Sequence, residues 1–206
     1  MPRQTTPNTT YQQLLTRWFT NDTAFDRLYP ISSQLLSQRH WTPLNVAKVA
    51  AGFLASPKGA RILDIGSGIG KFCLAGAHFN RHVSFYGIEQ RENFVEEAEH
   101  AKKILGLQNV HFLKGNFSKL DFSQFNHFYF FNSFYENLTG KEKLDNSLSF
   151  SDSIFFEYSC LLFQKLAKTP KGTRLVTYHG LTQQIPTQFR LAEEYVSGFL
   201  ECWIKE

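Results

Sequence analysis

The chain has 206 residues, of which 42% are hydrophobic and 19% charged, with a formal net charge of +4 at pH 7. This composition excludes a disordered chain, and the length suits one domain with a core of its own. The positive charge is small and shows none of the clustered basic stripe that is typical of nucleic-acid-binding proteins. We therefore expect no nucleic-acid partner.

The cysteine pattern argues against a disulfide scaffold and against a metal site. Cys73, Cys160 and Cys202 form no Cys-x-x-Cys pair, their number is odd, and the seven histidines show no ligand spacing. No apolar run is long enough to span a bilayer, and the first residues lack the apolar stretch of a secretory signal. We expect a cytoplasmic protein with no metal and no membrane contact. The sequence leaves its oligomeric state open.

The first 58 residues predict a helical extension. Thr42 followed by Pro43 is typical of a helix start, because threonine caps the first turn and proline fits the first helical position. We expect residues 1–58 to form this extension, or a lid, and residues 59–206 to form the core, within one domain overall. The spacing of apolar residues predicts helices over 11–19, 22–29, 33–38 and 43–55.

From residue 59 onward, strands and helices alternate, which predicts an α/β fold with a parallel sheet covered by helices on both faces. The stretch from 189 to 196 fits either a helix or a strand, and an antiparallel hairpin is expected to end the sheet. The predicted strands cover 60–65, 82–89, 109–115, 125–133, 172–180 and 199–205, and the predicted helices cover 70–79, 92–106 and 150–168.

The turn after the first of these strands, within ILDIGSGIG, carries the strongest functional signal. Ligands of open α/β sheets bind at the carboxyl ends of strands, and glycines there let the backbone approach a ligand closely. A phosphate-binding P-loop fails here, because its first glycine would fall at Ile65 and its Ser/Thr position is Phe72. A dinucleotide-binding motif has weaker support, because it requires Gly-x-Gly-x-x-Gly and the third glycine, Gly70, comes one residue before that position.

The stretch from Asp64 to Gly70 resembles the first motif of the seven-strand, class I methyltransferases, which use S-adenosylmethionine. That motif is an acidic residue, any residue, and then glycines at alternate positions. The resemblance implies a Rossmann-like seven-strand methyltransferase sheet, with the turn lying against the cofactor and Asp64 attracting its cationic ammonium group. Glu89 ends the next strand, about 20 residues on, where an acid accepts hydrogen bonds from the ribose hydroxyls.

The third strand ends in the place where this family has Gly-Asp-hydrophobic, a turn that contacts the adenine. Here Asn116 replaces the aspartate, and its amide can still hydrogen-bond the adenine edge, while Phe117 can pack on the adenine face. The resemblance thus assigns the following residues to S-adenosylmethionine: Asp64, Gly66, Ser67, Gly68, Gly70, Glu89, Gln90, Asn116 and Phe117.

The stretch Asn132-Ser133-Phe134-Tyr135 ends the fourth strand, which faces the transferred methyl group in this family. Its two ends match the Asn/Asp-Pro-Pro-Tyr motif of enzymes that methylate adenine N6 or glutamine, but both prolines are missing. Asn132 to Phe134 is also similar to the Asn-Asn-Phe of non-SET histone lysine methyltransferases, with Ser133 in place of one asparagine. That second resemblance extends to Gly87-Ile88-Glu89, Gly115-Asn116-Phe117 and Trp41-Thr42-Pro43.

The lysine resemblance implies a protein lysine as the methyl acceptor. Asn132 and Tyr135 would then be catalytic, and Trp41, Thr42 and Phe134 would bind the substrate. An apolar channel lowers the pKa of a lysine amine, ordinarily about 10.4, and so favours the neutral form that reacts. Two alternatives stay open: a small-molecule methyltransferase, or a module that binds the cofactor without catalysis.

Overall fold

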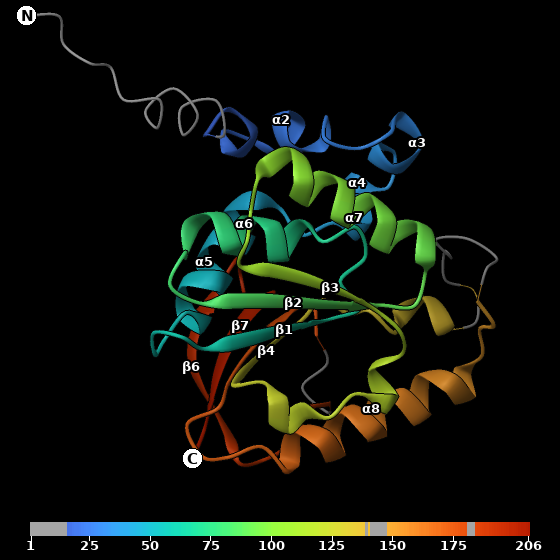
Figure 1. Cartoon of the computed structure of the whole chain (residues 1–206). Helices are drawn as coiled ribbons and strands as arrows, with labels where there is room; N and C mark the ends of the chain where they lie inside the picture. Colours follow the sequence, from blue (N-terminus) through green and yellow to red (C-terminus); the bar gives the residue numbers. More distant parts are fainter. Residues whose placement is uncertain (1–15, 139, 141–147, 181–183) are drawn as a thin grey trace, which may run out of the picture.

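The computed structural model describes residues 16–138, 140, 148–180 and 184–206, and these form a seven-strand sheet with helices on both faces (Figure 1). The strand order is β3-β2-β1-β4-β5-β7-β6, parallel except for β7, which is antiparallel to β5 and β6. The expected α/β class and the closing antiparallel hairpin are confirmed. The strands are β1 (Arg61–Ile65), β2 (Ser84–Glu89), β3 (Val110–Lys114), β4 (His127–Phe130), β5 (Arg174–Tyr178), β6 (Phe189–Tyr195) and β7 (Leu200–Lys205).

Two layers of helices cover this sheet. Buried residues of α5, α6 and α7 join one apolar cluster on the first face, and buried residues of α8 join a second cluster on the other face. The abundant phenylalanine is used in both clusters, as expected from the cost of leaving aromatic area in water. The main helices are α5 (Leu44–Leu54), α6 (Lys71–Phe79), α7 (Glu92–Leu105) and α8 (Asp152–Ala167).

Local sequence signals explain where these helices begin and end. The N-cap of α8 is Ser151, whose hydroxyl oxygen accepts a hydrogen bond from Ile154 N at 3.2 Å. The C-cap of α7 is Gly106, which adopts the left-handed conformation with φ +59°. The register of β1 against β2 and β4 then sets the carboxyl ends of these three strands side by side, which is where the site forms.

The N-terminal segment is less regular than the sequence predicts. The expected helix at 22–29 stops at Asp26 and continues as tight turns to Tyr29, before Pro30. The expected helix at 33–38 is two single turns, because its serines have low helix propensity. The predicted helix at 11–19 lies partly outside the described residues. Its described part is a short 3-10 turn. The segment consists of η1 (Arg17–Phe19), α2 (Asp22–Asp26), α3 (Ile31–Gln34) and α4 (Ser37–His40).

Candidate functional site

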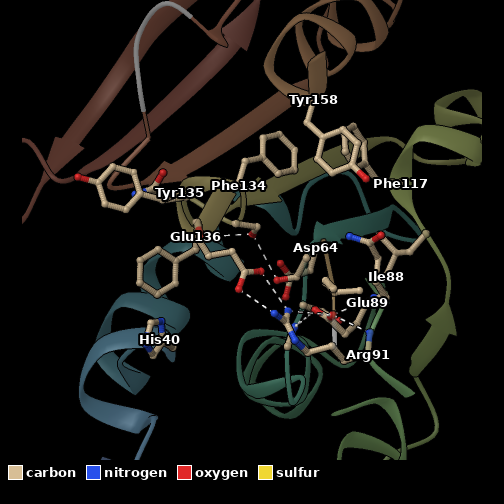
Figure 2. Close-up of a pocket in the computed structure, with 18 of the residues that line it drawn as sticks. His40, Asp64, Ile88, Glu89, Arg91, Phe117, Phe134, Tyr135, Glu136 and Tyr158 are labelled. Atoms are coloured by element: carbon tan, nitrogen blue, oxygen red, sulfur yellow. Dashed lines mark hydrogen bonds and ion pairs between the residues drawn. The ribbon is translucent and has the colours of Figure 1, made fainter. Parts of the chain in front are cut away.

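A cavity of about 440 Å³ opens at the carboxyl ends of β1, β2 and β4 (Figure 2). Its walls come from the glycine-rich turn, the ends of β2 and β4, the start of α8 and the N-terminal segment near residues 40–42. The position agrees with the general rule for open α/β sheets. Of the residues named from the sequence, these line the cavity: Trp41, Thr42, Asp64, Gly66, Ser67, Gly68, Glu89, Gln90, Phe117, Asn132, Phe134 and Tyr135.

The glycine-rich turn has a backbone that side chains would not tolerate. Gly66, Gly68 and Gly70 have φ of +75°, +52° and +82°, which is the left-handed region that favours glycine. A Cβ on Gly66 would collide with the Ser133 side chain, and one on Gly70 would collide with the Phe112 ring. The turn is therefore held close to the β4 end on one side and to the sheet on the other.

Asp64 lies at the floor of this cavity and is almost completely buried, with 3% of its surface exposed. Burial raises the pKa of its carboxyl group from 3.8 to about 8; the Cys73 thiol, which donates to Oδ2 at 3.6 Å, acts in the opposite direction. A cationic group in the cavity would favour the ionised carboxylate. The residue therefore fits the ammonium group of S-adenosylmethionine.

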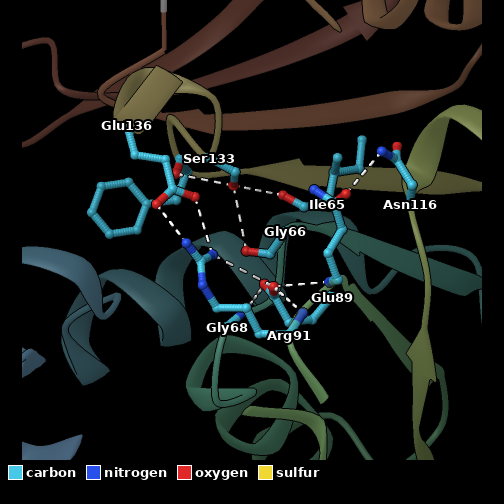
Figure 3. A network of polar contacts seen from close by, with 10 residues as sticks. Ile65, Gly66, Gly68, Glu89, Arg91, Asn116, Ser133 and Glu136 are labelled. Carbon is cyan, nitrogen blue, oxygen red and sulfur yellow. Dashed lines mark hydrogen bonds and ion pairs between the residues drawn. The ribbon is translucent and has the colours of Figure 1, made fainter. Parts of the chain in front are cut away.

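Glu89 ends β2 and organises the backbone around it (Figure 3). Its Oε2 accepts a hydrogen bond from Gly68 N at 3.1 Å, and its Oε1 accepts from Gln90 N at 2.8 Å and Arg91 N at 2.9 Å. Burial raises the pKa of this carboxyl group, and these hydrogen bonds and the Arg91 charge lower it. The carboxylate thus lies beside the glycine-rich turn, within the cavity, where ribose hydroxyls would reach it.

The Asn116 side chain forms hydrogen bonds with other residues of the protein. Its Oδ1 caps the following turn by accepting from Ser118 N at 2.9 Å, and its Nδ2 donates to Gln90 Oε1 at 2.9 Å and to the Tyr158 hydroxyl oxygen. The expected Asn116 contact with adenine would compete with these bonds. Gln90, which Asn116 orients, lines the cavity beside it.

Phe117 and Phe134 form one aromatic group with Tyr158 of α8. The rings of Phe117 and Phe134 stack with centroids 4.9 Å apart, and Tyr158 meets each of them at 5.4 Å. Both phenylalanines are buried, and Phe134 also packs against Phe130. Phe134 therefore belongs to the core as well as to the cavity wall.

The turn after β4 carries the residues assigned to the acceptor. Asn132 has φ +40°, an uncommon value outside glycine, and Ser133 Oγ donates to Ile65 O at 2.7 Å, which fixes the turn to β1. The Asn132 Oδ1 atom is buried in the cavity wall and has no hydrogen-bond partner in the described part of the chain. The Tyr135 ring is 37% exposed at the same rim.

Trp41 and Thr42 approach the cavity from the N-terminal segment. The Thr42 hydroxyl lies 2.9 Å from the hydroxyl of Tyr129 on β4, and the Trp41 ring lies 5.0 Å from the ring of Tyr29. The Lys71 Nζ atom is 5.5 Å from the centroid of the Trp41 ring. A cation of the chain is therefore already close to this aromatic wall.

Other cavity residues were missed by sequence reasoning. Arg91 is buried, and its guanidinium forms a forked ion pair with Glu136, with Nη1 to Oε1 at 3.1 Å and Nη2 to Oε2 at 2.7 Å. His40 and Phe131 also line the cavity. No local pattern marks such a pair, because its members lie 45 positions apart. The one signal in the sequence was the position of Arg91, a basic residue that directly follows Glu89 and Gln90 at the end of a predicted strand.

Among the residues that the structure describes, no three His, Cys, Asp or Glu side chains are grouped so that they could hold a metal ion. None of the described helices has the length and apolarity needed to cross a membrane.

Comparison with known proteins agrees with this geometry. A family model described as a methyltransferase domain matches residues 56–205. The tRNA (guanine-N(7)-)-methyltransferase of Nostoc sp. (strain PCC 7120 / SAG 25.82 / UTEX 2576) is 36% identical over 81 residues, which is 39% of this chain and 36% of that protein. The match thus spans little more than a third of that relative's length.

Solved structures share the fold. TrmN from Thermus thermophilus has a TM-score of 0.57 at 18% identity, covering 82% of this chain and 51% of that one. An RNA methyltransferase from Salinibacter ruber, in complex with S-adenosyl-L-homocysteine, has a TM-score of 0.54 at 18% identity, covering 79% of this chain and 90% of that one. At this identity the likeness shows the fold alone.

The comparisons overturn one expectation. We expected no nucleic-acid partner because no basic stripe is present, but the relatives are named as tRNA methyltransferases. The reasoning failed because a small net charge does not exclude recognition of RNA by shape and by base stacking. The family is confirmed: the chain belongs to the methyltransferase domain family, with the fold of the class I methyltransferases, and this membership supports S-adenosylmethionine as its cofactor.

Proposed function

We propose that this enzyme methylates a nitrogen of a base in RNA. The observation that carries the proposal is the buried Oδ1 of Asn132, a hydrogen-bond acceptor without a partner in the described residues. Leaving such an atom unpaired costs free energy, so the position suits a ligand that donates an N–H there. Nucleobases carry such groups on their rings and exocyclic amines.

The cofactor supplies an electrophilic methyl group when it is bound. The protein's part is to place the acceptor nitrogen in line with that methyl, since positioning supplies much of the rate of such a displacement. Asn132 would hold the N–H of the acceptor, while the rigid turn fixed by Ser133 would set its direction. Asp64 would hold the ammonium group of the cofactor, and Glu89 would hold its ribose.

Two independent features support RNA as the acceptor. The relatives that match in sequence are named tRNA methyltransferases. In addition, the rings of Phe131, Tyr135 and Phe150 line the cavity, and aromatic rings are the usual partners of unstacked RNA bases. A lysine acceptor has weaker support, because the relatives that match in sequence are named for a tRNA base and not for a protein side chain.

The test uses S-adenosylmethionine with a labelled methyl group and purified enzyme, and it offers cell RNA stripped of protein, cell protein and cell metabolites together as acceptors. We expect label in the RNA that nuclease digestion releases as a methylated nucleoside. Label that appears only in added protein and resists nuclease would establish a protein acceptor instead, and label only in small molecules would establish a metabolite. Either result would contradict the proposal.

The matched variants are Asn132→Ala and Asn45→Ala. Asn45 is exposed on α5 and does not line the cavity. We expect Asn132→Ala to reduce turnover by about tenfold or more while changing cofactor affinity little, because it removes a contact made only to the acceptor. Asn45→Ala should behave as wild type. Equal turnover of Asn132→Ala and wild type would remove the role of Asn132.

A further inference from the structure

Arg91 joins two parts of the site that are far apart in the sequence. Arg91 lies between β2 and α7. Its guanidinium donates two hydrogen bonds to the carboxylate of Glu136 (Figure 3). Glu136 belongs to the 3-10 turn η4 (Tyr135–Asn137), which follows Asn132 in the turn after β4. Both side chains line the cavity. A forked, charge-assisted pair of this kind has a fixed geometry, so it holds the end of β2 and the turn η4 at a set distance from each other.

The same residue also contacts the cofactor side of the cavity. Arg91 N donates to Glu89 Oε1 at 2.9 Å, and its Nη1 lies 3.7 Å from that oxygen. The Arg91 charge favours the ionised form of Glu89, against the burial that raises the pKa of this carboxyl group. The guanidinium therefore lies between two carboxylates, one at the ribose position and one on the acceptor turn.

The acceptor turn, residues 131–138, is held by the buried Phe134 ring, by Ser133, by backbone hydrogen bonds and by the Arg91–Glu136 pair. Its own backbone bonds are Tyr135 N to Asn132 O at 3.0 Å, Asn137 N to Phe134 O at 3.0 Å and Leu138 N to Tyr135 O at 3.1 Å. Ser133 fixes its first residues to β1. At its far end, Glu136 ties the turn to the opposite wall of the cavity through Arg91.

We propose that Arg91 is a positioning residue with two separate roles, one at the cofactor site and one at the acceptor turn. Through Glu89 it keeps the ribose-binding carboxylate ionised and in place, and through Glu136 it holds the turn that carries Asn132. This inference depends on cofactor binding and not on the identity of the acceptor. It therefore stands or falls separately from the proposal that the acceptor is RNA.

The test compares Arg91→Lys, Arg91→Met and Glu136→Gln in the full chain. Calorimetry with S-adenosyl-L-homocysteine measures cofactor affinity, and hydrogen exchange at the amides of Tyr135, Asn137 and Leu138 measures opening of the turn. We expect Glu136→Gln to keep affinity within about threefold and to speed exchange of the turn by about tenfold, since it removes the charge from the fork and leaves Arg91 and Glu89 unchanged. Arg91→Met should speed exchange similarly and weaken affinity by at least about tenfold.

Arg91→Lys separates charge from geometry. An ammonium restores a positive charge beside Glu89 but cannot make the fork to Glu136. We therefore expect nearly normal cofactor affinity together with fast exchange of the turn. Lys103→Met, an exposed cation on α7, is the control, and the thermal midpoint of every variant shows whether the whole fold has weakened.

The proposal is overturned if Glu136→Gln leaves exchange of the turn unchanged. It is also overturned if Glu136→Gln and Arg91→Met weaken affinity equally, or if Arg91→Lys loses as much affinity as Arg91→Met. A merely structural role would move both readouts together with the thermal midpoint. If Arg91→Met does not fold, the other two variants still decide, because each predicts a split between affinity and exchange.

Discussion

Asp64 shows at the level of one residue how a binding site opposes stability. Its folded pKa is about 8, raised first by burial, whereas an unfolded aspartate titrates near 3.9. Between these two pH values the folded state holds a proton that the unfolded state has lost. Without cofactor, the free energy of unfolding therefore falls as the pH rises from about 4 to about 8.

Asp64→Asn should remove this pH dependence and also the attraction for the cofactor's ammonium group. We expect the cofactor-free variant to be more stable than wild type at pH 8, with the difference shrinking toward pH 4, and to bind S-adenosyl-L-homocysteine at least about tenfold more weakly. Urea unfolding at several pH values and calorimetry measure the two effects.

The control is Glu157→Gln, which changes an exposed carboxylate on α8. It should follow the wild-type pH profile and bind cofactor normally. If Asp64→Asn were less stable than wild type at pH 8, the carboxyl group would already be ionised and stabilised by partners in the cofactor-free protein.

At this scale the sequence locates the motif residues at the cavity but does not predict the long-range pairs. The positions of Asp64 and Glu89 follow from their place beside glycines and at strand ends, and both line the cavity. The pairing of Arg91 with Glu136 has no local signature, because it depends on how β2 and β4 are placed in the sheet. Asn116 could be located but its hydrogen bonds could not, since Tyr158 comes from a helix 42 positions later.

Among the elements, the N-terminal segment is tied to the cofactor turn by one buried lysine. Lys71, the first residue of α6, forms ion pairs with Asp22 and Asp26 of α2, each at 2.7 Å. The Tyr29 hydroxyl adds a hydrogen bond to Ile69 O at 2.9 Å. The extension expected from the sequence is thus attached directly to the turn that we assign to the cofactor.

Lys71→Met should loosen that attachment, because it leaves two carboxylates without their cation. We expect a loss of stability on the order of 3 kcal/mol, tempered by the partial exposure of Asp22, together with faster proteolysis within α2. Urea unfolding and limited proteolysis measure both. Lys103→Met is the control and should match wild type, whereas an unchanged midpoint for Lys71→Met would show that other contacts hold the segment.

Low pH should also weaken the packing of the N-terminal segment against α6, through protonation of a histidine. The His78 ring of α6 stacks on Phe19 with centroids 3.8 Å apart, and burial, aided by the charge of Arg81, lowers the pKa of His78 to about 4. The unfolded chain binds this proton near pH 6.5 and the folded chain does not. The stabilisation by neutral His78 is therefore present above about pH 6.5 and is lost as the pH falls toward 4.

His78→Phe keeps an aromatic ring at this position but cannot take up a proton. We expect its stability relative to wild type to increase as the pH is lowered from about 7 to about 4.5, as measured by urea unfolding. His100→Phe, at an exposed position on α7, is the control. A relative stability that does not change with pH would mean that His78 is protonated in the folded chain as easily as in the unfolded one.

The regular elements follow from the sequence more closely than the N-terminal turns do. Continuous apolar runs such as those of β1 and β4 are buried on both faces, so their pattern is unambiguous. The sequence did not distinguish helix from strand at 189–196. The reason is that β6 is an edge strand whose side chains are mostly exposed, so its pattern of apolar residues is weak. Pairing with β7, which the local pattern does not contain, decides its conformation.

At the scale of the whole molecule, the net charge of +4 distinguishes the possible acceptors. RNA is a polyanion and is attracted to a positive protein, with release of counterions on binding. A lysine-rich protein segment carries the same sign of charge as the enzyme and is repelled. A neutral small molecule experiences neither effect. The sign of the salt dependence thus reports the class of acceptor without knowledge of its sequence.

We expect binding of RNA to the cofactor-loaded enzyme to weaken by about tenfold or more between about 50 and 200 mM salt. The measurement is a filter-binding or anisotropy titration with labelled RNA at several salt concentrations, with a lysine-rich peptide as the matched control. Binding of the peptide should not weaken with salt, because screening reduces repulsion as well as attraction. RNA affinity independent of salt, or a peptide that binds more tightly than RNA at low salt, would contradict an RNA acceptor and return the lysine hypothesis to first place.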